Sequence, residues 1–293
     1  MKNYHCPNFF RNQQCFFILH DLLNKYPYAF IENVHFGSVY GALPNMIWNG
    51  GSTSKGPTQD ANQIKDLFSF YKELNIPMKL TLTNPTLDED DLKDKYCNSV
   101  LKIAEDYSDN IEILISSPLL EDYIRKYYPE FTFSHSILAT KNDKTVEEYV
   151  EECEKYHHIV LPRRLGKNYE FLNSIPEEYR NRFEILCTDP CPIDCPNLYN
   201  HYEIMGNYQR GANLDKSIIH CVHNFTSPFQ YAEFAKDQIS TIEIANIYEP
   251  AKFSEFKLSG RSNITGIITM IEYFFKPEFR RDAYAIILGS GVQ

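Results

Sequence analysis

The chain has 293 residues, of which 43% are hydrophobic and 14% aromatic, so it can bury a large core and is not mainly disordered. With 29 Lys and Arg against 39 Asp and Glu, the formal net charge is −10, which disfavours a nucleic-acid partner without a local basic site. No run approaches the ~18 apolar residues of a membrane span, and the first residues lack an apolar segment followed by a small-residue cleavage site. We therefore expect a cytoplasmic protein, not bound to a membrane, whose partner is a small molecule or another protein.

Apolar runs of strand length alternate along the chain with charged, amphipathic stretches of helical length, a pattern typical of parallel β-α units. In chain order, strands are predicted at 28–37, 77–84, 110–117, 131–138, 157–162 and 182–187. Helices are predicted between them at about 61–74, 91–107, 118–127, 145–156 and 168–175. Several of these helices begin at a suitable capping residue, such as Asp60, Ser117 or Thr145.

The last third of the chain completes this pattern. Residues 217–223 and 229–236 are alternatives for a seventh strand, and 254–260 is predicted as the eighth, before an apolar helix at 263–275. We therefore predict an α/β fold, with residues 1–293 forming a single TIM-like (β/α)8 barrel domain that carries an N-terminal helical extension at about 1–27. In such a barrel, the reacting groups lie at the C-terminal ends of the strands.

The alternative fold is an open, doubly wound sheet, which usually carries a glycine-rich first turn that binds phosphate. The segment GALPNMIWNGG at 41–51 follows the first predicted strand, and its glycines lack the G-x-G-x-x-G spacing. The barrel is therefore favoured.

Eight cysteines in a chain without an export signal argue against a disulfide framework and leave core packing, metal binding or redox chemistry. The scattered ones are expected in the core: Cys6, Cys15, Cys97 and Cys153. The others are clustered as C-x3-C-x3-C, with one further along the chain: Cys187, Cys191, Cys195 and Cys221. Soft sulfur ligands in a proline-rich loop suit an iron–sulfur cluster or tetrahedral zinc. The spacing fits neither paired C-x2-C zinc knuckles nor the radical-SAM motif C-x3-C-x2-C.

Two separate motifs resemble the collagenase-like peptidase U-32 superfamily. The segment CTDPCPIDCPNLYNHYE at 187–203 is similar to the part of that family in which cysteines after a barrel strand precede Cys-Pro and a downstream histidine. The segment FKLSGRSN at 256–263 is similar to the family's (F/L)-K-(I/L)-x-G-R signature, which is likewise followed by a helix. The resemblance covers about residues 28–275.

This resemblance implies a barrel that holds a [4Fe-4S] cluster on four cysteines, in a family whose members hydroxylate RNA bases or quinone precursors without oxygen. Cys191, Cys195 and Cys221 are the best candidate ligands. Cys187 continues the alternation of Phe183 and Ile185, so it is equally a ligand or a core residue; in the second case one iron would be open to substrate. Zinc is the alternative metal.

Candidate catalytic residues follow from position. His201 lies in the cysteine loop at a position that resembles the family's downstream histidine, and Glu32 lies at the end of the first predicted strand. Trp48 and Asn49 lie in the loop after that strand, where an aromatic residue can cover a planar substrate or simply fill space.

Basic residues at the predicted barrel mouth indicate an anionic ligand. Arg163 and Arg164 follow the fifth predicted strand, and Lys257 and Arg261 accompany the eighth. Arginine can bind a carboxylate or phosphate through two parallel hydrogen bonds, although surface arginines without a ligand are the alternative. Lys257 lies within an apolar strand, so we expect it to face the barrel interior or to pair with an acid.

The sequence therefore predicts an iron–sulfur-dependent, U-32-like barrel enzyme. It would perform redox or group-transfer chemistry, including oxygen-independent hydroxylation, on a small anionic or aromatic substrate. A non-catalytic metal-binding partner subunit and an RNA-modifying enzyme are alternatives, and the acidic composition weakens the second. A peptidase ranks lower because the chain has neither a G-x-S-x-G nor an H-E-x-x-H motif.

Overall fold

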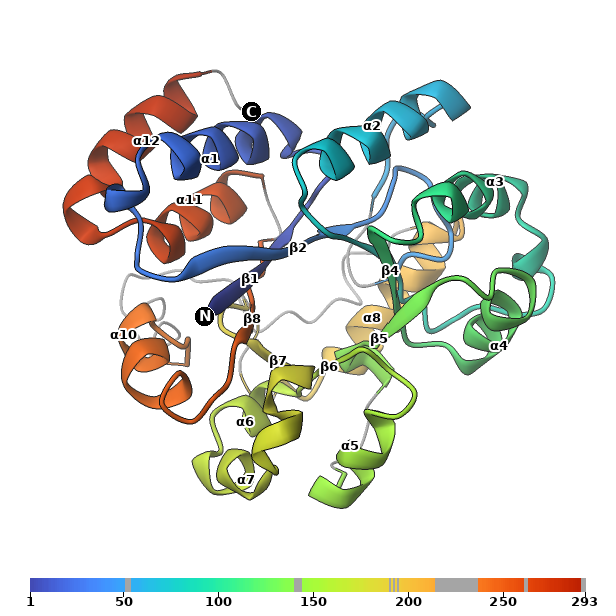
Figure 1. Ribbon diagram of the computed structural model, residues 1–293. Helices are drawn as coiled ribbons and strands as arrows, with labels where there is room; N and C mark the ends of the chain where they lie inside the picture. Colours follow the sequence, from blue (N-terminus) through green and yellow to red (C-terminus); the bar gives the residue numbers. More distant parts are fainter. Residues whose placement is uncertain are drawn as a thin grey trace.

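The computed structural model describes residues 1–50, 54–139, 144–189, 191, 193, 195–213, 237–260 and 263–290. Eight parallel strands of the described chain form a closed barrel in sequence order, and the eighth strand pairs with the first. Helices surround the strands (Figure 1). The protein is therefore the (β/α)8 barrel that the alternation of strands and helices predicts.

The strands are short and close to the predicted positions, with one exception near the N-terminus. Their bounds are β1 Lys2–Pro7, β2 Val34–Gly41, β3 Met78–Leu82, β4 Ile111–Ile115, β5 Thr132–His135, β6 His158–Val160, β7 Phe183–Leu186 and β8 Glu255–Lys257. Strands β3 to β8 fall inside predicted segments. Residues 217–223 and 229–236, the alternatives for a seventh strand, lie outside the described residues. Strand β7 at 183–186 pairs directly with β8, so no further strand lies between these two.

Each predicted helical segment contains a helix of the structure. The bounds of the helices are α1 Gln13–Lys25, α2 Ala61–Glu73, α3 Lys95–Ala104, α4 Pro118–Tyr127, α5 Val146–Glu152, α6 Arg163–Gly166, α7 Tyr169–Ser174, α8 Leu198–Gln209, α10 Thr241–Glu243, α11 Asn263–Phe274 and α12 Arg280–Gly289. Helices α6, α8, α10 and α12 were not predicted. Asp60 and Thr145 each form a capping box, and the Ser117 side chain accepts a hydrogen bond from the backbone of Leu120.

The prediction of a helical extension at residues 1–27 is wrong in its first part. Lys2–Pro7 is barrel strand β1, which pairs with both β2 and β8, and helix α1 follows it. The sequence KNYHCP shows polar and aromatic residues instead of an apolar run because its inward face meets polar neighbours. There, the His5 side chain contacts Ser38 and Glu255.

The first predicted strand, 28–37, begins too early. Strand β2 starts at Val34, and Asn33 before it has a left-handed backbone with φ of 59°. The apolar residues before Asn33 do not belong to β2. Phe30, for example, forms an isolated β-bridge with Phe275. Glu32 consequently lies at the N-terminal end of a strand, opposite the end that we expected.

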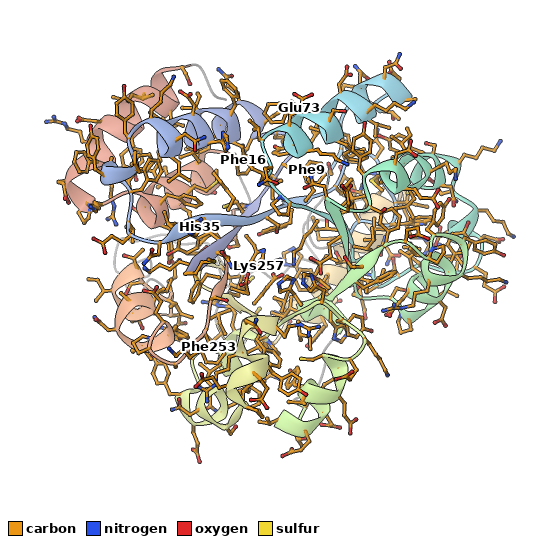
Figure 2. All side chains as sticks on the ribbon, in the orientation of Figure 1. Phe9, Phe16, His35, Glu73, Phe253 and Lys257 are labelled. Carbon is orange, nitrogen blue, oxygen red and sulfur yellow. The ribbon has the colours of Figure 1, made fainter. Side chains whose placement is uncertain are left out.

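Apolar side chains fill the layer between the barrel and its helices. Tyr4 of β1 packs against Tyr273 and Phe274 of α11, with ring centroids 5.7 and 5.3 Å apart. Figure 2 shows Phe16 between the barrel and the helix layer, and Lys257 inside the ring of strands. The outward faces of the strands therefore form the hydrophobic core, and the inward faces are free to carry polar groups.

Candidate functional site at the barrel mouth

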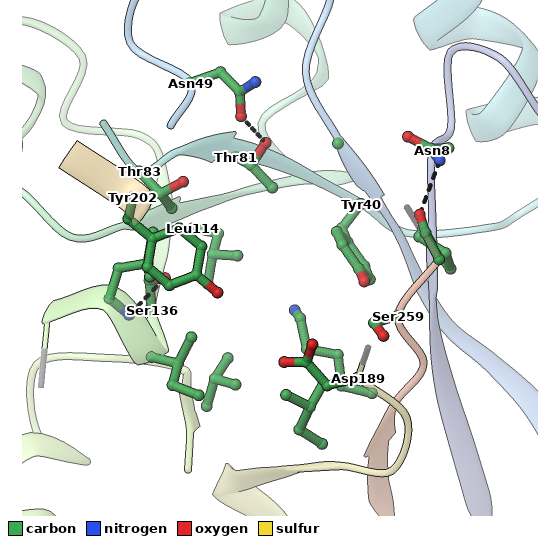
Figure 3. A pocket seen from close by; sticks show the side chains of 18 residues that line it. Asn8, Tyr40, Asn49, Thr81, Thr83, Leu114, Ser136, Asp189, Tyr202 and Ser259 are labelled. Carbon is green, nitrogen blue, oxygen red and sulfur yellow. Dashed lines mark hydrogen bonds between the residues drawn. The ribbon is translucent and has the colours of Figure 1, made fainter. Parts of the chain in front are cut away.

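A pocket of about 150 Å³ lies at the C-terminal ends of the strands. Its lining includes a residue from, or just after, each strand: Pro7, Tyr40, Thr81, Leu114, Ser136, Val160, Leu186 and Lys257. Figure 3 shows these side chains converging on the cavity. Among the described residues that line the pocket, Lys257 is the only cation and Asp189 the only carboxylate. This is the end of a barrel at which active sites are built.

Polar residues around the pocket are held by hydrogen bonds. The Thr81 hydroxyl donates to Oδ1 of Asn49 over 2.9 Å, and Asn8 Nδ2 donates to the Gly260 carbonyl over 3.2 Å (Figure 3). The Tyr40 hydroxyl donates to the Leu258 carbonyl over 2.6 Å. These contacts join loops that follow different strands, so they fix the shape of the mouth.

Helix α8 contributes Tyr202 to the pocket and is fastened to the loop after β3. Asn84 Nδ2 donates to the Gly206 carbonyl over 3.1 Å, and a Cβ atom at position 206 would meet Asn84 Oδ1 at 2.3 Å. Only glycine permits this close approach. Arg210, just beyond the helix, pairs with Asp88 and Asp91. The helix is therefore a fixed wall of the pocket.

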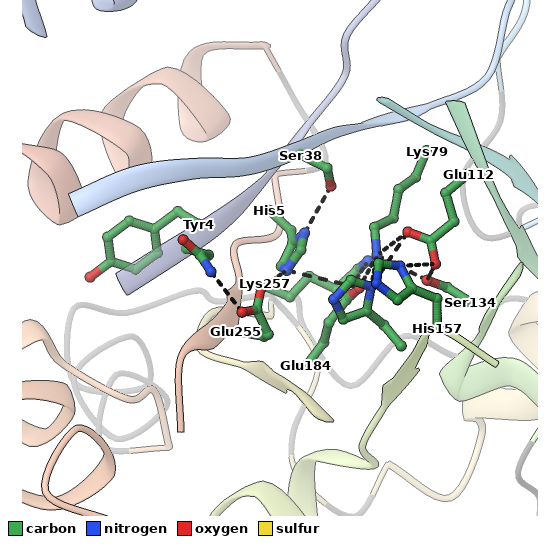
Figure 4. Close-up of polar contacts among 12 residues, drawn as sticks. Tyr4, His5, Ser38, Lys79, Glu112, Ser134, His157, Glu184, Glu255 and Lys257 are labelled. Atoms are coloured by element: carbon green, nitrogen blue, oxygen red, sulfur yellow. Dashed lines mark hydrogen bonds and ion pairs between the residues drawn. The ribbon is translucent and has the colours of Figure 1, made fainter. Parts of the chain in front are cut away.

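Lys257 extends from β8 into the floor of the pocket. Its side chain is almost completely buried, and Nζ lies 3.0 Å from Oε2 of Glu184 and 4.1 Å from the ring centre of Tyr40. This placement agrees with the expectation that Lys257 faces the interior and pairs with an acid. Figure 4 shows the lysine among the other charged groups of the barrel interior.

A second buried lysine lies deeper in the barrel. Lys79 Nζ contacts Oε1 of Glu184 at 2.5 Å, Oε2 of Glu112 at 2.9 Å and the Ser134 hydroxyl at 2.9 Å (Figure 4). It also lies 3.0 Å from Nδ1 of His158. Charges inside a protein are tolerated when they are paired in this way. We call Lys79, Glu112, His158, Glu184 and Lys257 the interior ion cluster.

The two lysines of this cluster have opposite pKa shifts. Burial opposes the charge on Lys79, but the carboxylates of Glu112 and Glu184 outweigh it and raise its pKa. The pKa of Lys257 is lowered, because burial and the charge on Lys79 together outweigh the opposing effect of Glu184. Burial, followed by the charge on Lys79, lowers the pKa of His158 to about 4. Lys79 is therefore the fixed cation of the cluster.

Another polar group in the barrel resembles a hydrolytic triad in composition. The Ser38 hydroxyl lies 2.8 Å from Nδ1 of His5, whose Nε2 lies 3.0 Å from Oε2 of Glu255. Ser38 is 1% exposed and is not among the residues that line the pocket. Because a nucleophile must reach its substrate, we interpret this group as structural.

Glu112, His157 and His158 are the one group of three potential metal ligands found among the described residues, with ligand atoms within 4.8 Å of one another. The Lys79 ammonium is already hydrogen-bonded to Glu112 and lies close to His158. A metal ion would have to displace this cation, so the group does not form a ready metal site.

The cysteines separate into two environments. Cys187 belongs to the hydrophobic core, its thiol faces the Ile185 carbonyl, and burial raises its pKa well above the usual value. This placement favours the core alternative for Cys187. Cys191 is buried and Cys195 half-buried in the loop between β7 and α8, next to the mouth. Cys221 lies outside the described residues. The scattered cysteines are buried, as expected: Cys6, Cys15, Cys97 and Cys153.

Arg163 is the first residue of α6, directly after β6, and so lies at the mouth end of the barrel. Its side chain is buried at 8% exposure, and neither terminal guanidinium nitrogen has a hydrogen-bond partner among the residues that the structure describes. Arg164 is partly exposed and has partners of its own. Arg261 lies outside the described residues.

The remaining predicted site residues have different placements. Asn49 lines the pocket, whereas Trp48 is fully buried and donates to the Asp91 carbonyl over 2.8 Å, which is a packing role. His201 lies in α8, partly buried and beside Tyr202. Glu32 is exposed at the opposite end of the barrel from the pocket.

Sequence reasoning missed most of the interior ion cluster and most of the residues that line the pocket. Lys79, Glu112 and Glu184 each lie within an otherwise apolar strand segment. A charged residue in such a segment indicates a side chain that faces the barrel interior. Asp189 and Tyr202 are ordinary loop and helix residues in the sequence, and no local pattern marked them.

No family model and no curated protein matches the chain. A solved structure described as the U32 peptidase Mk0906 is similar at 13% identity, covering 89% of this chain and 93% of that chain, with a TM-score of 0.49. A likeness at this level carries no argument about the site, so function is argued from the residues themselves. In the described part of the chain, no helix has both the length and the apolar character to cross a bilayer.

Proposed function

We propose that this protein is a barrel enzyme that binds a small substrate with an anionic group at the C-terminal mouth of its barrel. The observation that carries the proposal is the buried guanidinium of Arg163, which lacks a partner among the described residues. A buried, unpaired charge is costly, and a carboxylate or phosphate would satisfy it through two charge-assisted hydrogen bonds.

The pocket supports a compact substrate. Its volume of about 150 Å³ is close to that of a cavity known to hold one small aromatic ring. The hydroxyl and amide groups of Asn49, Thr81, Ser136 and Ser259 offer hydrogen bonds that would orient such a molecule. Val160 of β6 lines the pocket, and Arg163 follows it by three residues. Arg163 is not itself among the described lining residues, so the anionic group would bind beside the pocket, at the end of β6.

The test compares thermal and urea unfolding of the parent protein and Arg163→Met with a panel of small carboxylates and inorganic phosphate. An anion that binds should stabilise the parent by about 2.7 kcal/mol at a hundred times its dissociation constant. Arg163→Met should lose this effect. Without any anion, Arg163→Met should be more stable than the parent by about 1–3 kcal/mol, because the unpaired charge is gone.

Arg281→Met is the matched control. The Arg281 side chain is 93% exposed and pairs with the neighbouring Asp282, so its replacement should change neither the stability nor the response to anions. The proposal is refuted if no anion stabilises the parent, or if Arg163→Met responds to anions as the parent does.

A second candidate function adds a [4Fe-4S] cluster beside this pocket, in a U-32-like enzyme that performs redox or group-transfer chemistry such as oxygen-independent hydroxylation. The observation that favours it is the hydrogen bond from the Cys191 backbone to Asp189 Oδ1 (3.0 Å), which joins the cysteine loop to the pocket. Cys191 and Cys195 would hold the cluster with Cys221, whereas Cys187 does not fit because it belongs to the apolar core. Such a cluster would supply an open iron as a Lewis acid.

Purification without oxygen, followed by iron, sulfide and zinc analysis and an optical spectrum, tests the cluster. We expect iron and acid-labile sulfide in comparable amounts. Cys191→Ser or Cys195→Ser should remove most of the cluster, while Cys187→Ser and the control Cys97→Ser should retain it. If the analysis finds zinc alone, or no metal, this second candidate is rejected, and the proposal of an anion site is not affected.

The other functions that the sequence analysis leaves open receive less support. The net charge of −10 disfavours RNA as the substrate. A peptidase would need an accessible nucleophile, whereas Ser38 is buried and is not among the described residues that line the pocket. A non-catalytic partner subunit would bind metal and a second protein without turning over a substrate, so the same metal analysis combined with an activity screen separates it from an enzyme.

A further inference from the structure

We propose that Lys257 is a nucleophile that forms an imine with the carbonyl carbon of an oxo acid bound at the barrel mouth. The inference rests on the proposed function, because the carboxylate of the oxo acid is the anionic group that Arg163 would bind. It adds a reacting residue and a substrate class, namely small molecules that carry both a carbonyl and a carboxylate.

The position of Lys257 suits this role. It is the only amine in the described part of the pocket lining, and its side chain is almost completely shielded from water. The Tyr40 ring covers one side of Nζ, and the Tyr40 hydroxyl is held by the Leu258 carbonyl, so the ring is fixed. The amine is therefore confined between this ring, Glu184 and the cavity.

The interior ion cluster explains why Lys257, and not Lys79, would react. Glu184 offers one negative charge to two lysines, with Oε1 at Lys79 and Oε2 at Lys257 (Figure 4). Lys79 has Glu112 as a second carboxylate, whereas no second carboxylate contacts Lys257 among the described ion pairs. Burial and the charge on Lys79 lower the pKa of Lys257 and so favour its neutral form.

The step balances without an oxidant or reductant. The neutral Nζ of Lys257 adds to the carbonyl carbon, and the electron pair of the carbonyl double bond moves to oxygen. The new carbon–nitrogen bond becomes an imine when the carbon–oxygen bond breaks. The two hydrogens of the amine leave with that oxygen as water, and nothing is oxidised or reduced.

Reductive trapping tests the imine. The parent protein is incubated with pyruvate, glyoxylate or the neutral aldehyde butanal in the presence of sodium cyanoborohydride, and labelled lysines are located by peptide mass mapping. Pyruvate should add its own mass less one oxygen atom to Lys257. A lowered pKa raises the fraction of neutral amine, so labelling of Lys257 should exceed that of exposed lysines severalfold.

Two variants serve as controls. Lys257→Arg keeps a cation beside Glu184 but cannot form an imine, so it should fold and lose the label. Lys155→Arg removes an exposed lysine and should leave the label on Lys257 unchanged. Mapping of the parent protein alone still decides the question if Lys257→Arg fails to fold.

The outcomes separate the two proposals. If carboxylates stabilise the parent through Arg163 but no label forms on Lys257, the imine is refuted and the proposed function stands. If oxo acids and butanal label Lys257 equally and no carboxylate stabilises the parent, the nucleophile is supported and the anion site fails. Equal labelling of Lys257 and exposed lysines would also overturn the inference.

Discussion

Glu184 is the residue on which the barrel interior depends. It is fully buried, and lysine ammonium groups contact both of its carboxylate oxygens. The cationic neighbours hold the pKa of Glu184 well below its usual value despite burial. One residue therefore neutralises the deep lysine and positions the pocket lysine, which links the stability of the barrel to the chemistry of its mouth.

His158 gives the protein a predictable response to acid. Its pKa is lowered to about 4 from an ordinary value of 6.5, so between these values the unfolded chain binds a proton that the folded protein does not. Stability from this residue is thus present above pH 6.5 and lost as the pH falls towards 4, by on the order of 2–3 kcal/mol. Urea unfolding of the parent and of His158→Gln from pH 7 to pH 4 measures it.

His35→Gln is the control for this pH dependence, because His35 is exposed. The loss of stability between pH 7 and pH 4 should be smaller in His158→Gln than in the parent, and unchanged in His35→Gln. Equal losses in all three proteins would show that His158 is not buried in its neutral form.

Prediction for single residues succeeded where a charged residue lies within an apolar strand. Lys257 in an apolar strand led to the expectation of an interior position or an acidic partner, and the ion pair with Glu184 agrees with it. The same argument applies to Lys79 and Glu112, each of which interrupts an apolar strand. Which charges meet depends on the register of strands far apart in the sequence, and local pattern cannot supply that register.

At the scale of elements, helix starts can be tested through their caps. The Asp60 side chain accepts hydrogen bonds from the backbone of Asn62 and Gln63, and the Asp60 backbone N–H donates one to Oε1 of Gln63. Asp60→Ala should lower the free energy of unfolding by about 1 kcal/mol. The control Asp66→Ala lies on the exposed face of the same helix and should change stability little. Equal effects in urea unfolding would contradict the cap.

Strand prediction worked for β3 to β8 and failed at the N-terminus for a physical reason. Those six strands include apolar residues that pack in the hydrophobic core, such as Phe133 in β5 and Phe256 in β8. Strand β1 has His5 and Asn3 on its inward face, where both contact Glu255. Its sequence therefore lacks the apolar run by which a strand is predicted. The partner that makes this strand favourable is 250 residues away in the sequence.

At the scale of the whole molecule, β1 and β8 close the barrel and join distant parts of the chain. Their pairing brings Asn3 opposite Glu255 and His5 opposite Lys257, so the pocket lysine depends on barrel closure. The alternation of elements predicted the barrel and the end at which a site would lie. The environment of the cysteine loop depends on tertiary packing, and so the sequence left the role of Cys187 open.

The central claim is that an anion binds at the barrel mouth through Arg163, and a crystal structure of the parent protein with its best-stabilising anion tests it most directly. We predict density for the anion at the C-terminal ends of the strands, with its oxygens about 3 Å from the Arg163 guanidinium nitrogens. An anion bound elsewhere, with the Arg163 guanidinium still buried and unpaired, would contradict the account.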